Sequence, residues 1–78
     1  MNTYQFVIFL DSYRVGSIEK VYKSKSLTSA LNKLIKFLYN LTDKYDEISI
    51  DYEVEINNKD CFDLYEVDKN HPIHNFLI

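Results

Sequence analysis

The stretch EISIDYEVEI at residues 47–56 decides the fold, because apolar and polar side chains alternate along it without exception. The apolar positions are Ile48, Ile50, Tyr52, Val54 and Ile56, and the polar positions are Glu47, Ser49, Asp51, Glu53 and Glu55. A strict period of two is typical of a half-buried strand, since successive side chains point to opposite faces of a sheet. We therefore predict a strand whose apolar face packs against a helix and whose other face shows four carboxylates to water.

An amphipathic helix is predicted just before this strand, over residues 27–45. Its apolar stripe recurs at alternating steps of four and three residues: Leu27, Leu31, Leu34, Leu38, Leu41 and Tyr45. Ser26 is the predicted N-cap, with Thr28 as an alternative start. The whole apolar arc spans about 200°, which is wider than one sheet face. The flanks of the helix must then contact the C-terminal tail, a second subunit or a partner.

Three further segments are rich in β-branched and aromatic residues and are predicted to be strands: residues 4–10, 15–22 and 61–67. The last of them follows a turn at residues 57–60, where two asparagines tolerate positive φ. Two orientations of this last strand stay open. Its inward side chains are either Phe62 and Leu64 or Cys61, Tyr65 and Val67.

These elements predict an α+β fold in the order β-β-α-β-β, with a four-stranded, mainly antiparallel sheet and one helix packed on one face. A short apolar C-terminal tail follows at residues 73–78. The chain of 78 residues is long enough for a single compact domain, residues 1–78, with one modest core. The second sheet face has no helix, so we expect Val7 and Phe9 to be exposed there unless the tail or another chain covers them.

The two parts of the chain differ strongly in charge, although the formal net charge is only −3. Residues 1–40 carry six basic and two acidic side chains, a net charge of +4, whereas residues 41–78 carry ten acidic and three basic side chains, a net charge of −7. The positive charges precede the helix or lie on it, and many negative charges lie on the last two strands. Such asymmetry indicates an electrostatic partner.

The sequence predicts no enzyme, with no catalytic, cofactor-binding or metal-binding residues. Cys61 has no base close to it in the sequence that would activate its thiol. His71 and His74 have a spacing of three but lack the further ligands of a structural zinc site, which needs four. The single Gly16 excludes a glycine-rich loop that could hold phosphates.

A cytoplasmic location is predicted, in the cytoplasm of the host cell if the chain is viral. The first residues carry no basic segment, and the apolar run at residues 6–10 is too short for a signal peptide or a membrane span. The lone Cys61 cannot form an internal disulfide, whereas small secreted domains usually carry several cysteines. We therefore expect no contact with a membrane.

The acidic strand face gives the sharpest functional prediction. Alternate residues of a strand lie about 6.7 Å apart, and phosphates along one DNA strand about 3.4 Å apart, so a neighbouring strand would have to supply part of a second row. Together with the small size, this face is typical of a viral or mobile-element accessory protein, an inhibitor of the anti-CRISPR or DNA-mimic type that binds a basic surface of host nucleic-acid-handling machinery. The predicted partner-binding residues are Asp51, Glu53, Glu55, Asp63, Glu66 and Tyr65.

Two alternatives stay open. The acidic face could serve solubility alone. The chain could instead be a small homodimeric nucleic-acid-binding regulator that uses the lysines of its first half, namely Lys20, Lys23, Lys25 and those of the helix. A homodimer would form through the uncovered sheet face or the helix flank. Apart from this alternative, nucleic acid is not the expected partner, because the acidic face repels phosphates.

Overall fold

The computed structural model describes residues 1–11 and 16–77. Its elements are strands β1 (Asn2–Leu10), β2 (Gly16–Ser24), β3 (Ile48–Ile50), β4 (Glu53–Ile56) and β5 (Asp60–Asp63), helix α1 (Leu27–Leu41), and the 3-10 turns η1 (Leu64–Glu66) and η2 (Pro72–Asn75). The sheet order is β2-β1-β4-β5, β3 also pairs with β1, and all these pairings are antiparallel. The predicted α+β fold with one helix on a mainly antiparallel sheet is confirmed.

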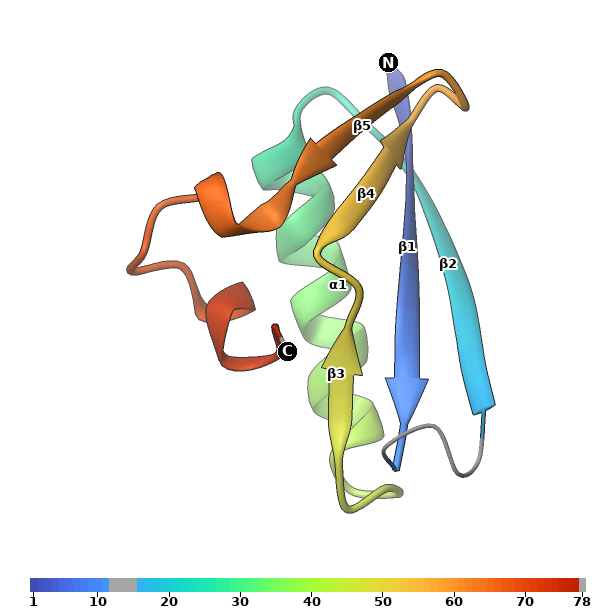
Figure 1. Ribbon diagram of the computed structural model, residues 1–78, viewed down its shortest axis with the longest axis vertical. Coiled ribbons are helices and arrows are strands. Elements are labelled where there is room, and N and C mark those ends of the chain that lie inside the picture. The colour runs from blue at the N-terminus through green and yellow to red at the C-terminus, as the bar shows by residue number, and fades with distance from the viewer. Residues whose placement is uncertain (12–15, 78) are drawn as a thin grey trace.

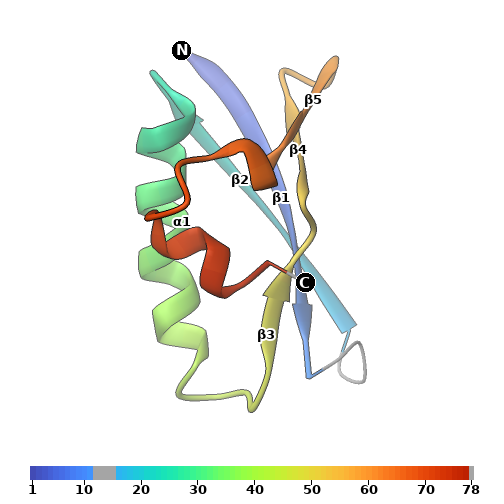
Figure 2. The same ribbon diagram turned by 60° about the vertical axis from the view of Figure 1, so that its left-hand side comes forward.

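Helix α1 lies across one face of the sheet, and the core fills the space between them (Figures 1 and 2). Alternate residues of β1 and six residues of α1 are buried there: Tyr4, Phe6, Ile8, Leu10, Ala30, Leu31, Leu34, Ile35, Leu38 and Leu41. The helix begins as predicted, because the Ser26 side chain accepts a hydrogen bond from the Ser29 N–H at 3.2 Å. No helix in the described residues covers the opposite face of the sheet.

The helix ends at Leu41, so the predicted end at Tyr45 is wrong. The Thr42 hydroxyl donates a hydrogen bond to the Tyr39 carbonyl at 2.6 Å, a local contact that competes with further helix formation. The N–H groups of Lys44 and Tyr45 then both bond to the Leu41 carbonyl. The chain therefore leaves the helix in a tight turn, and Tyr45 packs against the core from outside the helix.

The C-terminal segment covers one flank of the helix (Figure 2). Ile73 in η2 is fully buried, and the Phe76 ring contacts the Tyr39 ring with centroids 5.9 Å apart. The Phe76 carbonyl accepts a hydrogen bond from the Ile50 N–H, and Leu77 forms a parallel bridge with Ile50. The sequence left three possible contacts for the helix flanks: the tail, a second subunit or a partner. The structure shows the tail in contact with the helix, on the helix side of the sheet.

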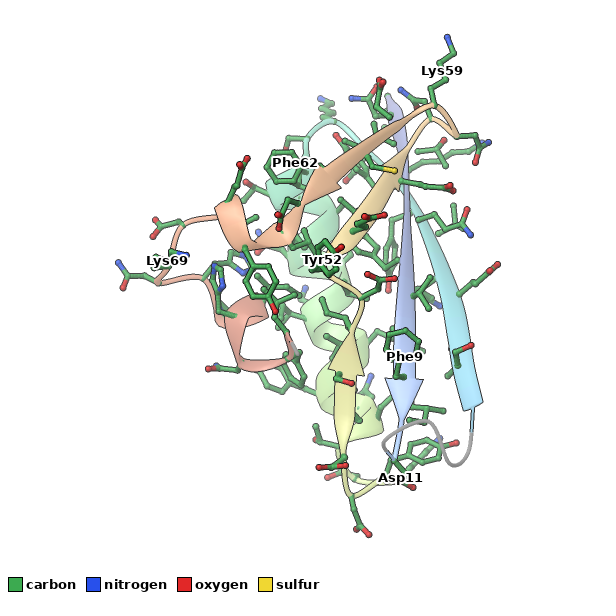
Figure 3. All side chains as sticks on the ribbon, in the orientation of Figure 1. Phe9, Asp11, Tyr52, Lys59, Phe62 and Lys69 are labelled. Atoms are coloured by element: carbon green, nitrogen blue, oxygen red, sulfur yellow. The ribbon has the colours of Figure 1, made fainter. Side chains whose placement is uncertain are left out.

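The strand predicted at residues 47–56 is broken into β3 and β4. Between the two pairings with β1, two residues of β1 lie opposite the four residues 51–54, so the partner strand holds two extra residues. Because this number is even, the alternation continues across the break, and Ile50 and Val54 are both 0% exposed. Tyr52, which was predicted to point inward, lies instead at the bend and is 47% exposed (Figure 3).

The turn between β4 and β5 confirms the asparagine prediction. Asn57 and Asn58 have φ values of 55° and 58°, in the left-handed region that Asn tolerates better than most residues. Asn57 also holds the turn against the start of β1, because its Oδ1 accepts the Thr3 N–H and its own N–H donates to the Thr3 carbonyl, both at 2.8 Å. These bonds fix the β4–β5 hairpin in place beside β1.

The strand predicted at residues 61–67 is shorter than expected, since η1 follows β5 directly. The Asp63 carboxylate accepts a hydrogen bond from the Tyr65 N–H at 2.8 Å and so caps the 3-10 turn. Leu64 is fully buried and Phe62 packs against the core. The first of the two predicted orientations, with Phe62 and Leu64 inward, is therefore right.

The β1–β2 hairpin is regular, with nine consecutive residue pairs. The strand predicted at residues 15–22 continues to Ser24, and Val15 lies outside the described residues. Ile18 and Tyr22 pack against the core as expected. Strand β2 ends the sheet on this side, so its outer edge has no strand beside it within the described residues.

Candidate functional site

The sheet face opposite the helix carries a hollow of about 220 Å³ that is bordered by carboxylates. The described side chains that line it are Gln5, Val7, Glu19, Asp51, Glu53, Glu55 and Cys61. The strand register explains this grouping, because Glu19 lies opposite Val7 on one side of β1 and Glu55 lies opposite Gln5 on the other. We call the carboxylates of Glu19, Asp51, Glu53, Glu55 and Asp63 the acidic face.

The part of β1 beneath this face is mixed in character. Gln5 and Val7 line the hollow, and Phe9, further along β1 (Figure 3), is half-buried like Val7. The C-terminal tail does not reach them, since it packs beside β3 on the helix side. Carboxylates around a partly apolar floor can bind a cation that also brings hydrophobic contact area.

Like charges face each other directly within this site. Glu53 of β4 is the cross-strand partner of Asp63 of β5, and like charges in that position destabilise an antiparallel pair. Within the described residues, Glu19, Glu53 and Glu55 form no ion pair that would offset this repulsion. The negative charge of the face is therefore left for a partner or for solvent.

The break between β3 and β4 sets the position of Asp51. Its N–H donates to the Val7 carbonyl at 2.9 Å, so the residue stays tied to β1. Its Oδ1 accepts the Glu53 N–H at 3.1 Å, which closes a turn of the kind Asp favours. Asp51 is half-buried, and its carboxylate, like that of Asp63, accepts a backbone N–H.

Two exposed tyrosines lie beside the acidic face. The rings of Tyr52 and Tyr65 are 5.9 Å apart with an interplanar angle of 32°, and the side chains are 47% and 40% exposed. The negative charge of Glu53 raises the pKa of Tyr52 above its usual value of 10.0, and Asp51 and Asp63 add to this effect. The Tyr52 phenol therefore lies in the field of three carboxylates.

The structure brings most of the predicted partner-binding residues together. Four of them share the acidic face: Asp51, Glu53, Glu55 and Asp63. Tyr65 joins them through its contact with Tyr52, whereas Glu66 lies on η1 and is exposed outside the strand ladder. Sequence reasoning missed Tyr52 and Glu19. Glu19 points to the face opposite Ile18 on β2, but the pairing register is needed to place it across β1 from β4.

The second row of charge next to β4 is shorter than the sequence could allow. Asp63 lies on the acidic face opposite Glu53. Asp60 pairs with Ile56, so alternation places it on the helix side of the sheet. Glu66 and Asp68 come after β5 has ended. Asp63 is therefore the one acid of these four that stands in register with the row on β4.

Three lysines of the first half, Lys20, Lys23 and Lys33, lie where β2 meets α1. The Lys20 ammonium lies on the helix side, 4.3 Å from the centroid of the Phe37 ring, where a cation–π contact holds it. Lys33 Nζ donates to the Lys23 carbonyl at 3.1 Å, and Lys25 is exposed after the end of β2. Of the five lysines of the first half, Lys20 and Lys33 thus use their ammonium groups in contacts within the chain; the others are Lys23, Lys25 and Lys36.

A larger hollow of about 530 Å³ lies between the start of α1 and the segment after β5. Its apolar wall includes Leu27, Leu31 and Phe62. Two titratable groups also line it, but both serve local structure: Asp68 accepts the Asn70 N–H, and His71 Nδ1 accepts the Ile73 N–H. This hollow therefore shows no pair of groups arranged for acid–base chemistry.

Metal-binding geometry is not seen in residues 1–11 and 16–77, where no three His, Cys, Asp or Glu side chains come together to hold an ion. His74 Nε2 lies 2.9 Å from the Val67 carbonyl oxygen, and Cys61 is exposed opposite Glu55 on the edge strand. Over the same residues, no helix combines the length and the apolar character that crossing a membrane requires.

The chain matches no protein family, no curated protein and no solved structure. Its function therefore has to be inferred from the chemistry of its own residues. The acidic face is the feature of the described residues that combines charge, exposed aromatic rings and an open position on the molecule.

Proposed function

We propose that this chain is a non-enzymatic binding module whose acidic face engages a basic surface on a host protein that handles nucleic acid. In this proposal it is an accessory or inhibitor protein of a virus or mobile element, of the anti-CRISPR or DNA-mimic type, and it acts in the cytoplasm. The observation that carries the proposal is the grouping of four carboxylates, from β2, β4 and the bend before β4, around one hollow on the helix-free face, with Asp63 of β5 beside them opposite Glu53.

The energetic cost of this grouping supports a binding role. Opposed Glu53 and Asp63 repel each other across the β4–β5 pair, and such a pair costs a few tenths to about 1 kcal/mol. Neither side chain belongs to the core, and the capping bond of Asp63 needs an acceptor oxygen rather than a charge. Lys or Arg side chains of a partner would remove the repulsion, so the same charges would favour the complex.

The two exposed tyrosines supply the apolar part of such an interface. Tyr52 and Tyr65 offer adjoining rings at the border of the acidic face. Tyrosine is enriched among residues that dominate binding energy, since it brings a large rigid surface and a hydroxyl. An arginine of the partner could stack on these rings and reach the carboxylates around them.

The arrangement resembles a nucleic-acid backbone in charge rather than in spacing. The row on β4 has one carboxylate about every 6.7 Å, and a DNA strand has one phosphate about every 3.4 Å. Asp63 beside the row and Glu19 across β1 add charge on both sides of it. The proposal therefore requires a partner whose basic surface accepts a short, broad acidic patch.

Binding to immobilised poly-L-lysine at several salt concentrations tests the proposal. The variant carrying Asp51→Asn, Glu53→Gln and Glu55→Gln keeps the side-chain shapes and the Asp51 acceptor oxygen, and it removes three charges from the acidic face. We expect its affinity to fall by about tenfold or more at low salt, and the salt dependence to become shallower.

A matched control removes three charges elsewhere, with Asp43→Asn, Asp46→Asn and Asp60→Asn. These exposed residues lie outside the acidic face, so the control should retain most of the affinity. Equal losses in both variants would mean that total charge alone matters, as expected of a face that serves solubility. Stronger retention of the wild-type chain on heparin than on poly-L-lysine would overturn the proposal in favour of nucleic-acid binding.

A further inference from the structure

The two edges of the sheet differ in a way that points to a second copy of the chain. The β5 edge is four residues long and is ended by η1. The β2 edge is nine residues long and pairs with β1 without a bulge. Long regular edges readily pair with another strand, and short or interrupted edges do not.

The hydrogen bonds show which backbone groups of β2 face outward. Val7 and Thr3 of β1 bond toward β3 and β4, because their carbonyls accept the N–H groups of Asp51 and Asn57. In an antiparallel strand alternate residues bond to opposite neighbours, so the even-numbered residues of β1 bond to β2. Their partners on β2 are also even-numbered.

The odd-numbered residues of β2 therefore direct their N–H and C=O groups away from β1: Ser17, Glu19, Val21 and Lys23. The Lys23 carbonyl confirms this direction, since it accepts a hydrogen bond from Lys33 Nζ rather than from β1. Val21 stands at the middle of this set, and its side chain is 51% exposed. The outer edge thus presents ladder positions on both sides of an exposed valine, with the Lys23 carbonyl held by Lys33 in the single chain.

We propose that two copies of the chain pair antiparallel through their β2 edges, with Val21 opposite Val21 of the second copy. This register places Glu19 opposite Lys23 twice, once on each side of the two-fold axis. It also places Lys20 opposite Tyr22 twice on the helix side. Opposite charges, and a cation beside an aromatic ring, both stabilise cross-strand pairs. The edge is therefore complementary to itself.

Neighbouring registers lack this complementarity. A shift by one residue in each copy toward the N-terminus sets Lys20 opposite Lys20, and a further shift sets Glu19 opposite Glu19. A shift in the other direction sets Val21 opposite Lys23, Tyr22 opposite Tyr22 and Glu19 opposite Lys25, which lies beyond the end of β2. Repulsion between like charges opposes the first two registers, and in the third the partner of Glu19 is outside the strand, so the register centred on Val21 is the one that forms its opposite-charge pairs within β2.

The dimer would continue the sheet across the two-fold axis and turn both acidic faces to the same side. This inference does not depend on the proposed function, because it rests on the β2 backbone and on residues 19–23 alone. Lys33 would release the Lys23 carbonyl, which would then accept a hydrogen bond from the Glu19 N–H of the second copy. With Glu19 of each copy paired to Lys23, the two sets of Asp51, Glu53, Glu55 and Asp63 would lie on one side and offer a basic partner two binding surfaces.

Sedimentation velocity over about 1 μM to 1 mM, the range in which weak self-association is populated, tests the proposal on the full chain. Wild type should shift from monomer to dimer with concentration. Val21→Pro removes an N–H that the β1 ladder does not use, and proline is tolerated on edge strands, so this variant should stay folded by circular dichroism and monomeric. Val21→Thr keeps the N–H and should still dimerise. A monomeric wild type, or a Val21→Pro variant that dimerises like wild type, overturns the proposal.

Charge exchange tests the register itself. Glu19→Lys sets Lys against Lys and Lys23→Glu sets Glu against Glu, so each variant alone should raise the dimer dissociation constant by about tenfold or more at low salt. Mixing the two variants restores both complementary pairs in a heterodimer, and the doubly exchanged chain restores them in a homodimer. Association of the mixture no stronger than that of either variant alone would contradict this register.

Discussion

The two neighbours of β1 are built from similar alternating patterns but fold differently. Strand β2 pairs with β1 over nine consecutive residues, whereas the opposite neighbour is interrupted by two extra residues between β3 and β4. The unbroken strand leaves a straight outer edge with outward ladder positions. The broken strand bends, exposes Tyr52 and gathers carboxylates. The regular ladder thus leaves the β2 edge suited to pairing with a second copy, whereas the interrupted ladder forms the acidic face, which is suited to a charged partner.

The break is stabilised by specific hydrogen bonds. The Tyr52 carbonyl accepts the Leu64 N–H at 2.7 Å, and the Asp51 N–H still bonds to β1. The Asp51 carboxylate accepts the Glu53 N–H at 3.1 Å. Leu64 is fully buried, so its N–H would be costly to leave unpaired. The bend therefore keeps several of its backbone groups bonded where the regular ladder is interrupted.

The largest expected effect is on the free energy of unfolding, and it distinguishes the core side chains of β3 from those of β2. Ile50→Ala removes a side chain that is 0% exposed and whose backbone also holds the C-terminal tail, and it should cost about 2–5 kcal/mol of unfolding free energy. Ile18→Ala on β2 removes a partly buried side chain and should cost about 1–2 kcal/mol. Urea unfolding followed by circular dichroism measures both.

The urea m-value serves as the internal control for this comparison, because an unchanged slope shows that the folded and unfolded states keep their exposed areas. Equal losses for Ile50→Ala and Ile18→Ala would contradict the view that the broken strand, and not the edge strand, lies over the centre of the core.

A smaller effect is expected from the turn at the break. Asp51→Ala removes the acceptor for the Glu53 N–H and should lower the unfolding free energy by about 1 kcal/mol, as the loss of a side-chain cap usually does. Asp51→Asn keeps an acceptor oxygen and should be close to wild type in the same urea titration. If the two variants lost equal stability, the charge of Asp51 rather than its hydrogen bond would hold the bend.

Much of the fold follows from sequence periodicity. The leucine stripe of α1 and the Ser26 cap predict the helix and its start, and the alternation at residues 47–56 predicts which side chains enter the core on each side of the break. The break itself leaves no trace in that pattern, because two extra residues preserve a period of two. Tyr52 was misplaced for this reason. The helix ends where the Thr42 hydroxyl contacts the Tyr39 carbonyl, a polar contact that an apolar pattern does not show.

The sequence predicts those parts of the candidate site that depend on alternation along a single strand. Glu53 and Glu55 share a face by alternation, and Asp63 follows once the β4–β5 turn is placed. Glu19 belongs to the same hollow, but its place depends on the register of the β1–β2 hairpin, which alternation alone does not determine. Glu66 was assigned to a strand that ends earlier, since the Asp63 cap starts η1.

The smallest expected effect concerns ionisation of Tyr52. The charge of Glu53, the first cause of its raised pKa, acts on a phenol at the surface, so Glu53→Gln should move the titration of Tyr52 back toward 10.0. Glu55→Gln removes an equal charge from the same strand but is not among the causes, and it should leave the titration in place. The Cζ chemical shift of Tyr52, followed by NMR between neutral and high pH, resolves this residue from the other six tyrosines.

The dependence of folding stability on pH gives a second measurement of the effect of Glu53 on Tyr52. Because the folded state holds the Tyr52 pKa above its unfolded value, the unfolded chain loses the phenol proton first as pH rises. The contribution of Tyr52 to stability is therefore complete below the unfolded pKa and is lost as pH rises through the folded pKa. Glu53→Gln should weaken this dependence, and added salt should reduce it in wild type. If Glu55→Gln shifted the Tyr52 titration as far as Glu53→Gln does, the field at the bend would come from the whole acidic face rather than from the residue next to it.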